Sequence, residues 1–491
     1  MAEALQSLQA RLDDPTIPYQ KVVLVVVLAV SAFESLISSR QKPYLDPIRF
    51  PNLPSALRPF LTAPDAQDTY RKSQAYARHK LKFASIVGVV GLLQSLILLT
   101  RWSLPIIHKL ALPIPTPSAV TQAGSWTLLK GLWDLAGQVP KVGTSELRHT
   151  AAFIAIMNLI GTVLSVPEGL YKNFVLEEQH GFNKMTYGTF TKDLFKGLAL
   201  SFALEIPLST ALVALINWVG TSAILTLLAY VLSFSFLLVI LMVPLGPYVI
   251  MPLFNKFTLL ETSSPVYPKV KALAERVGFP CDRIYTIDGS KRSSHSNAFV
   301  TGIPGLQKQI VIYDTLIEKA TPDEVEAILA HELAHWKYSH IVYLLFTALT
   351  QIAFSLSIFT LFLSNQSLLA SFGFSQPTTT LLTKSSSTTV GPTVISLFLA
   401  STLFSPLSSF LAFLTNSITR KLEYEADAFA VGLGREMTEN LKTALIGIHE
   451  KNLAVYQVDP VYSAWNHNHP TLLERLEALD KKFLEMEQKA K

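Results

Sequence analysis

The sequence predicts a predominantly α-helical integral membrane protein with seven transmembrane helices and a small α+β insert. Of its 491 residues, 49% are apolar and only 16% are charged, and the mean hydropathy is positive. A soluble globular protein usually carries about 25% charged residues. The excess of apolar side chains therefore points to lipid as part of the solvent.

Seven near-continuous apolar runs have about the length that crosses roughly 30 Å of hydrocarbon as a helix. Polar connections of variable length separate them. The predicted spans are Val22–Ser38, Phe83–Thr100, Ala151–Val166, Leu198–Val219, Ile224–Ile250, Ile341–Leu363 and Val394–Leu414.

The orientation of these spans follows from the basic residues in the loops. About nine lysines and arginines lie between the first two spans, whereas about five lie in the longer segment between the second and third. Basic loops remain on the cytosolic side of a membrane. We therefore expect the N-terminus outside, and the segment between spans five and six and the C-terminal tail in the cytosol.

Charge and cysteine content exclude several function classes. The net charge of +5 is modest and suits the anionic inner face of a membrane, so no nucleic-acid partner is expected. Cys281 is the single cysteine, which rules out an internal disulfide and a metal cluster of thiolates.

A segment of mixed periodicity follows the fifth span. We predict a helix over Pro268–Val277 and two strands, Arg283–Ile287 and Gln309–Tyr313. Thr321, followed by a proline and then by Glu324, is a typical helix start, with a hydroxyl N-cap and a carboxylate at the third helical position. A new helix is expected to begin there.

This helix contains His331-Glu332-Leu333-Ala334-His335. Two imidazoles four residues apart project from one helix face and can bind one Zn²⁺. Zinc lowers the pKa of a bound water, and Glu332 is placed to accept its proton and pass it to a leaving amine. The spacing predicts a hydrolytic zinc site; the alternative is two histidines that make ordinary hydrogen bonds.

Two histidines leave the zinc ion short of a third protein ligand. Glu423 and Asp427, which follow the seventh span, share a helix face, whereas Glu425 is turned by roughly 200° from Glu423. We predict Glu423 as the third ligand and Asp427 as the acceptor for a ligand imidazole N–H. The alternative is a solvated acidic patch facing the basic residues Arg420 and Lys421.

Together, these motifs resemble those of gluzincin metalloproteases, and nearly the whole chain resembles the type I CAAX prenyl protease family. Beyond the two zinc motifs, four pieces carry the resemblance. They are Glu177–Lys184 (EEQHGFNK), His295–Phe299 (HSNAF), His469-Pro470 and Leu472–Arg475 (LLER). One departure is Glu425, where relatives often have Gln; it lies off the predicted ligand face.

The resemblance implies an activity and a setting. It implies one zinc ion per chain, helices that enclose a water-filled chamber, and residence in the endoplasmic reticulum membrane or the inner nuclear membrane. The substrates would be isoprenylated proteins, which lose the three residues after a prenyl-cysteine, with some precursors cut again upstream.

Roles for further residues also come from the resemblance. Asn297, with Ala298 and Phe299, would lie on a strand edge that pairs with an extended peptide. His469 would stabilise the oxyanion, and Arg475 would orient the Glu423 carboxylate.

The sequence divides into four parts on this interpretation. Residues 1–254 hold spans one to five, 255–340 form a cytosolic metalloprotease insert, 341–418 hold spans six and seven, and 419–491 supply the third zinc ligand. Glu34 and Glu205 lie inside apolar spans, facing either a wet interior or a membrane interface.

Two alternatives to a prenyl-protein protease remain at this stage. One is a related membrane protease that degrades misfolded membrane proteins. The other, from a different class, is a transporter or channel with an incidental metal motif.

Overall fold

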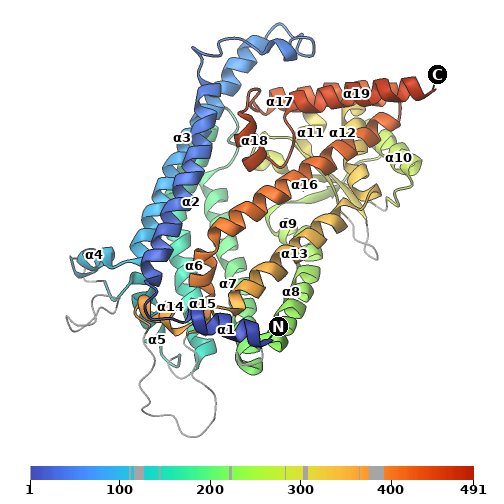
Figure 1. The fold of residues 1–491 in the computed structure, drawn as a ribbon. Helices are drawn as coiled ribbons and strands as arrows, with labels where there is room; N and C mark the ends of the chain where they lie inside the picture. Colours follow the sequence, from blue (N-terminus) through green and yellow to red (C-terminus); the bar gives the residue numbers. More distant parts are fainter. Residues whose placement is uncertain are drawn as a thin grey trace.

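The computed structural model describes residues 2–109, 112–114, 126–142, 145–220, 224–281, 283–301, 308–363, 365–374 and 392–490. Long helices form one body and a small sheet with shorter helices lies at one end of them (Figure 1). This confirms the predicted helical membrane protein with an α+β insert.

Six helical segments are long and apolar enough to cross a membrane. Each contains or closely matches one of the first six predicted spans. They are α2 (Tyr19–Gln41), α3 (Ala66–Leu99), α6 (Glu146–Tyr171) with a π-helical turn (Lys172–Glu177), α7 (Tyr187–Val219), α8 (Ile224–Leu245), which continues through a second π-helical turn (Gly246–Ile250) into α9 (Met251–Phe254), and α13 (His340–Thr360).

The seventh span differs from the prediction of one straight helix over Val394–Leu414. It consists of α15 (Thr393–Leu403) and α16 (Ser405–Gly432), bent by 63° between them. Pro406 in the first turn of α16 lacks the N–H that a continuous helix would need, which explains the break. Because α16 continues to Gly432, the predicted boundary between residues 418 and 419 lies inside a helix.

The C-terminal part of the fold contains the helices α17 (Arg435–Lys451) and α19 (Leu472–Ala490). Five shorter helices complete the membrane and C-terminal parts. The five are α1 (Ala2–Leu12), α4 (Leu104–Lys109), α5 (Leu128–Gly137), α14 (Gln366–Ser371) and α18 (Pro460–Asn466).

The first loop and the C-terminal segment pack on each other at the same end of the molecule as the insert. Leu53 and Leu57 share a buried apolar cluster with Tyr456 and Leu476, and the Arg40 guanidinium donates to Asp459 at 2.9 Å. The N-terminus lies at the opposite end (Figure 1). The first loop, the insert and the C-terminal segment therefore share one side of the membrane.

The spans bury little surface against one another. At most 11% of the apolar window of any of the six is buried in the protein, so most of their side chains face lipid or the interior of the helix bundle. Glu34 on α2 is exposed, and Glu205 on α7 accepts a hydrogen bond from Asn158 of α6 at 3.0 Å. Such loose packing is what the predicted chamber requires, and the chamber itself stays a prediction.

The insert is built on a four-stranded sheet with strand order β1-β2-β4-β3. The strands β2 (Arg283–Ile287) and β4 (Gln309–Tyr313) have the predicted bounds and pair in parallel. The strands β1 (Phe257–Leu259) and β3 (Ala298–Thr301) pair antiparallel with them. The residue pattern predicted neither strand, although the resemblance placed a strand edge at Asn297 to Phe299. Within the part of the chain that the structure describes, β3 pairs with β4 alone and lies at the end of the strand order.

Helices α10 (Val266–Val277), α11 (Asp314–Lys319) and α12 (Pro322–Lys337) complete the insert. The predicted cap of α12 is present, because the Thr321 and Glu324 side chains each accept from the other's backbone N–H. Leu329 and Leu333 of α12 are fully buried in the core of the insert. The helix ends before α13, with Ser339 at a positive φ of 57° between them.

A junction of polar and aromatic contacts joins the membrane helices to the loop that leads into β3. Tyr76 of α3 donates to Glu177 at 2.9 Å, and His295 Nε2 lies 3.6 Å from the same carboxylate. Phe182 stacks on the His295 ring at 4.2 Å. The contacts hold the start of β3 against the membrane part.

Candidate active site

The helix α12 presents two imidazoles from one face, as the spacing predicted. His331 is buried and His335 is half-buried. Their Nε2 atoms lie 3.2 Å apart, because residues four apart on a helix are neighbours on its surface. The pair leaves room for a shared ligand or ion between the two rings.

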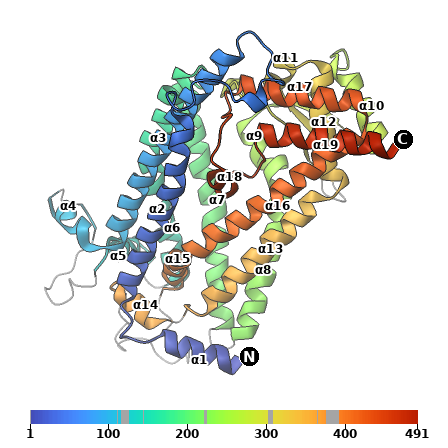
Figure 2. The same ribbon diagram turned by 45° about the horizontal axis from the view of Figure 1, so that its top comes forward.

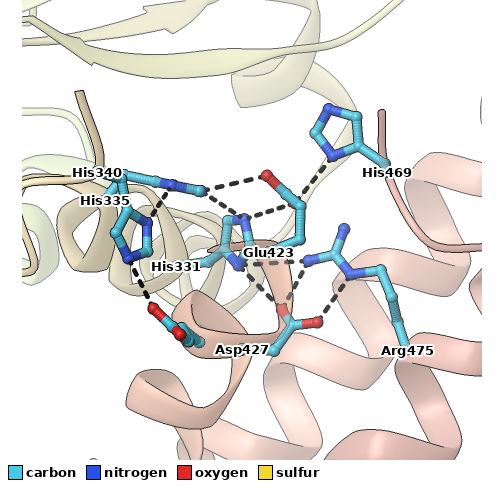
Figure 3. A network of polar contacts seen from close by, with 8 residues as sticks. His331, His335, His340, Glu423, Asp427, His469 and Arg475 are labelled. Carbon is cyan, nitrogen blue, oxygen red and sulfur yellow. Dashed lines mark hydrogen bonds and ion pairs between the residues drawn. The ribbon is translucent and has the colours of Figure 1, made fainter. Parts of the chain in front are cut away.

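Glu423 of α16 faces this pair, although it lies about ninety residues further along the chain (Figure 3). Its carboxylate oxygens lie 3.3 Å from His331 Nε2 and 3.4 Å from His335 Nε2. Ligands placed tetrahedrally at about 2.0–2.1 Å from a zinc ion lie about 3.3–3.4 Å from one another. The distances, the first to Oε2 and the second to Oε1, are of the size expected between ligands of one tetrahedral ion.

The Glu423 carboxylate is buried among imidazoles. Only 3% of the residue is exposed, and nitrogens of His331, His335 and His469 lie within 3.4 Å of its oxygens, although Oε2 accepts no hydrogen bond of good geometry from the described residues. A buried carboxylate is costly unless opposite charge or hydrogen bonds compensate it. A metal ion between Glu423 and the two imidazoles would compensate it, so the residues fit the implied metal.

The second nitrogen of His331 has a charged partner. His331 Nδ1 lies 2.9 Å from Asp427 Oδ1, and Arg475 of α19 donates to both Asp427 oxygens at 2.9 and 2.6 Å. Arg475 binds the carboxylate one helical turn beyond Glu423, and its expected role in orienting Glu423 stays a prediction. Asp427 therefore fixes the His331 ring and Arg475 fixes Asp427.

The other ligand imidazole has a partner that the sequence analysis missed. His340 Nδ1 lies 2.9 Å from His335 Nδ1, and His340 Nε2 lies 3.4 Å from Glu425 Oε2. When His335 directs Nε2 at a metal, its Nδ1–H donates to His340 and fixes the ring orientation. The sequence signal for this partner was a third histidine, His340, five residues after His335. Glu425 lies off the ligand face but contacts His340.

A cavity of about 490 Å³ opens beside these ligands. Its wall includes His331, Glu332, Glu423, Asn297 and Ala298. The cavity therefore brings the predicted base, two predicted ligands and the approach to β3 together.

Three further predicted residues take different positions. His469, which lies between α18 and α19, also lines the cavity, and its Nδ1 is 2.8 Å from Glu423 Oε2, with 56% of its side chain exposed. Asn297 is exposed and Phe299 is half-buried. Phe299 packs near Tyr313 at 6.4 Å between ring centroids and lies outside the cavity wall.

Electrostatics at the metal-free site favour a cation. Burial and Arg475 act to lower the pKa of His331, but hydrogen bonds to Asp427 and Glu423 outweigh them and raise it to about 9. Burial and then His331 lower the pKa of His335 to about 4. In the metal-free site the His331 imidazole is therefore protonated. Its positive charge takes the place of the charge that a bound metal ion would supply.

Burial also acts on the glutamate next to the first ligand. It raises the pKa of Glu332 above the ordinary value of a glutamate. A general base works best when its pKa approaches the working pH. Glu332 is suited to that task by its surroundings as well as by its place in the motif.

Known proteins are similar to this chain over nearly its whole length. Residues 49–256 match the family described as "CAAX prenyl protease N-terminal, five membrane helices", and residues 263–482 match peptidase family M48. The chain is 35% identical to CAAX prenyl protease 1 of Saccharomyces cerevisiae over 480 residues, covering 96% of this chain and 98% of the relative. It is 33% identical to an Arabidopsis thaliana homologue, covering 94% and 98%.

A solved structure agrees with these sequence matches. The crystal structure of S. mikatae Ste24p superposes with a TM-score of 0.80 at 33% identity, covering 95% of this chain and 100% of that one. The chain belongs to the CAAX prenyl protease family. It is an integral membrane metalloprotease, and the family and enzyme class predicted from the sequence are confirmed.

The buried pair Asp427–Arg475 yields a test of how the site is held. In metal-free protein, Asp427→Leu should leave the guanidinium buried without its partner and lower the free energy of unfolding by about 3–5 kcal/mol. The double variant Asp427→Leu/Arg475→Met should recover most of this loss. Denaturant unfolding of the detergent-solubilised full chain measures both.

The matched control is Asp68→Leu, which breaks the exposed pair of Asp68 with Lys72. Its cost should stay within about 1 kcal/mol. If Asp427→Leu is no more destabilising than this control, the buried pair does not hold the site together.

Proposed function

We propose that this metalloprotease is a zinc endopeptidase that removes the C-terminal three residues of isoprenylated CAAX proteins and cuts some prenylated precursors upstream. The observation that carries the proposal is the cluster His331, His335 and Glu423, of which His331 and Glu423 line a cavity. The names and full-length similarity of the relatives supply the substrate class.

One zinc ion per chain would be held by these three side chains. Their ligand atoms all lie within 4.8 Å of one another, and two imidazoles with one carboxylate form a common catalytic zinc set. When bound, zinc supplies a Lewis acid that acidifies water and polarises the scissile carbonyl. Asp427 and His340 keep the two imidazoles in the tautomer and orientation that present Nε2.

Glu332 is the proposed general base and acid. It follows the first ligand directly and lines the cavity, and its raised pKa lets it hold a proton between two steps. It takes the proton of the attacking water and delivers it to the nitrogen of the leaving peptide. No other described carboxylate lines this cavity except Glu423.

Two proposed substrate contacts line the same cavity. The peptide would pair as an extended strand with the edge at Asn297 and β3, through backbone hydrogen bonds that tolerate many sequences, with Ala298 at the cavity wall and Phe299 supporting the strand. His469, whose side chain is half exposed, would donate to the oxyanion. Its present contact with Glu423 would give way to the metal.

The proposed location is the endoplasmic reticulum membrane or the inner nuclear membrane, with the catalytic end in the cytosol. The basic first loop lies at the same end as the insert, and basic loops are cytosolic. A prenylated tail reaches such a site from the cytosolic leaflet.

Substitutions at Glu332 and His335 separate chemistry from metal binding. Glu332→Gln should retain about one zinc per chain and lose nearly all peptidase activity, since the base is removed and the ligands are not. His335→Ala should lose both zinc and activity. Metal analysis of the purified protein with a peptidase assay measures the two outcomes.

Activity of Glu332→Gln near the wild-type level, or wild-type protein without bound metal, would contradict the enzyme mechanism and favour a transporter or channel. The control is His149→Ala, which removes a histidine that contacts the Trp133 carbonyl far from the cluster. Its zinc content should not change.

Substrate class is tested with matched peptides. The purified chain should release a tripeptide from a farnesylated CAAX peptide much faster than from the same peptide with an unmodified cysteine. Mass spectrometry of the products identifies the cut. Equal rates on prenylated, unprenylated and unrelated peptides would favour a protease that degrades misfolded membrane proteins.

A further inference from the structure

The outer side of α3 carries a groove that belongs to no part of the proposed catalytic site. It lies between α3 and the 3₁₀ turn Lys42–Leu45 that follows α2, and has a volume of about 590 Å³. Its apolar part is formed by Ile86, Val89 and Val90, of which 53%, 56% and 45% are exposed. No residue of this groove lines the catalytic cavity.

The groove faces away from the interior of the fold. Ala77, Lys80 and Ala84 of α3 line a neighbouring cavity that also includes Tyr462 and His467 of the C-terminal segment and meets the groove at Leu45 and Leu81. At about 100° per residue, the groove side of α3 is turned by roughly 150° from these three. Figures 1 and 2 show α2 and α3 at one edge of the helices. The groove therefore opens toward the bilayer.

Three positive charges meet at one end of this groove. Lys42, Arg78 and Lys82 line it, and none of them forms an ion pair within the described residues. The Arg78 guanidinium is held in place by donating to the Leu45 carbonyl at 3.1 Å. A fixed guanidinium with two free ammonium groups forms a site for an anion.

The depth of the charges matches a lipid headgroup. The apolar run of α3 begins at Phe83, just after Lys82, so the cations lie at the membrane boundary and the apolar part lies below it. Lys82 and Val90 are eight residues apart, about 12 Å along the helix. Phosphate at the cations and a chain along Val89 and Val90 would fit this length.

We propose that this groove binds an acidic phospholipid of the leaflet on the catalytic side, with the headgroup on Lys42, Arg78 and Lys82 and an acyl chain on the apolar part. Charge complementarity selects an anionic over a zwitterionic headgroup. The groove shares no lining residue with the catalytic cavity, which favours a membrane lipid over the lipid anchor of a substrate as its occupant.

Native mass spectrometry of the full chain in neutral detergent tests the proposal, with phosphatidylserine and phosphatidylcholine as probes. The wild type should retain phosphatidylserine about tenfold more tightly. The double variant Lys42→Gln/Lys82→Gln should lose this preference while its thermal unfolding in detergent and its peptidase activity stay unchanged. The matched control Lys192→Gln/Lys271→Gln removes two exposed lysines elsewhere and should keep the preference.

Equal retention of both lipids by the wild type would overturn the proposal, as would a preference that survives Lys42→Gln/Lys82→Gln. An equal loss in the control pair would show attraction to overall charge instead of a site. Displacement of phosphatidylserine by a farnesyl-cysteine peptide would assign the groove to the substrate and also contradict the proposal.

Discussion

The structure depends on the compensation of two buried carboxylates on one face of α16. Glu423 and Asp427 expose only 3% and 2% of their surfaces, and buried charge destabilises a fold unless opposite charge and hydrogen bonds surround it. The partners come from α12, which supplies His331, and from α19, which supplies Arg475. In the sequence, these partners on α12 and α19 lie about 90 and 50 residues from the two carboxylates. Both helices must therefore converge on α16. Because α16 runs from the bend of the seventh span to Gly432, one continuous helix connects that span to both carboxylates.

Much of this site was predictable because its determinants are local. The cap at Thr321 and Glu324 defines where α12 begins, and helical spacing then sets His331 and His335 on one face. The same periodicity separates Glu423 and Asp427 from Glu425. Apolar run length alone located the first six spans, because the thickness of the hydrocarbon fixes the length of a helix that crosses it.

The remaining features depend on contacts between distant segments, which a local pattern does not contain. The short strand β3 forms because β4 offers it a partner, and nothing in four residues specifies that pairing. His340 reaches His335 only because Ser339 turns the chain between α12 and α13. Arg475 was expected at Glu423 and binds Asp427, a difference of one helical turn set by how α19 packs on α16. Pro406 was a local signal for the bend in the seventh span. The prediction followed the length of the apolar run instead and treated the span as one helix.

X-ray absorption at the zinc edge of the loaded full chain tests the central claim most directly. Two imidazole nitrogens and a carboxylate oxygen at about 2.0–2.1 Å are predicted around one zinc per chain, and Glu423→Ala should lose the carboxylate ligand and weaken binding, while the Glu425→Ala control should keep the same ligand set. Zinc bound less than stoichiometrically, or a spectrum that Glu423→Ala leaves unchanged, would contradict the convergence of α12 and α16 on one metal ion.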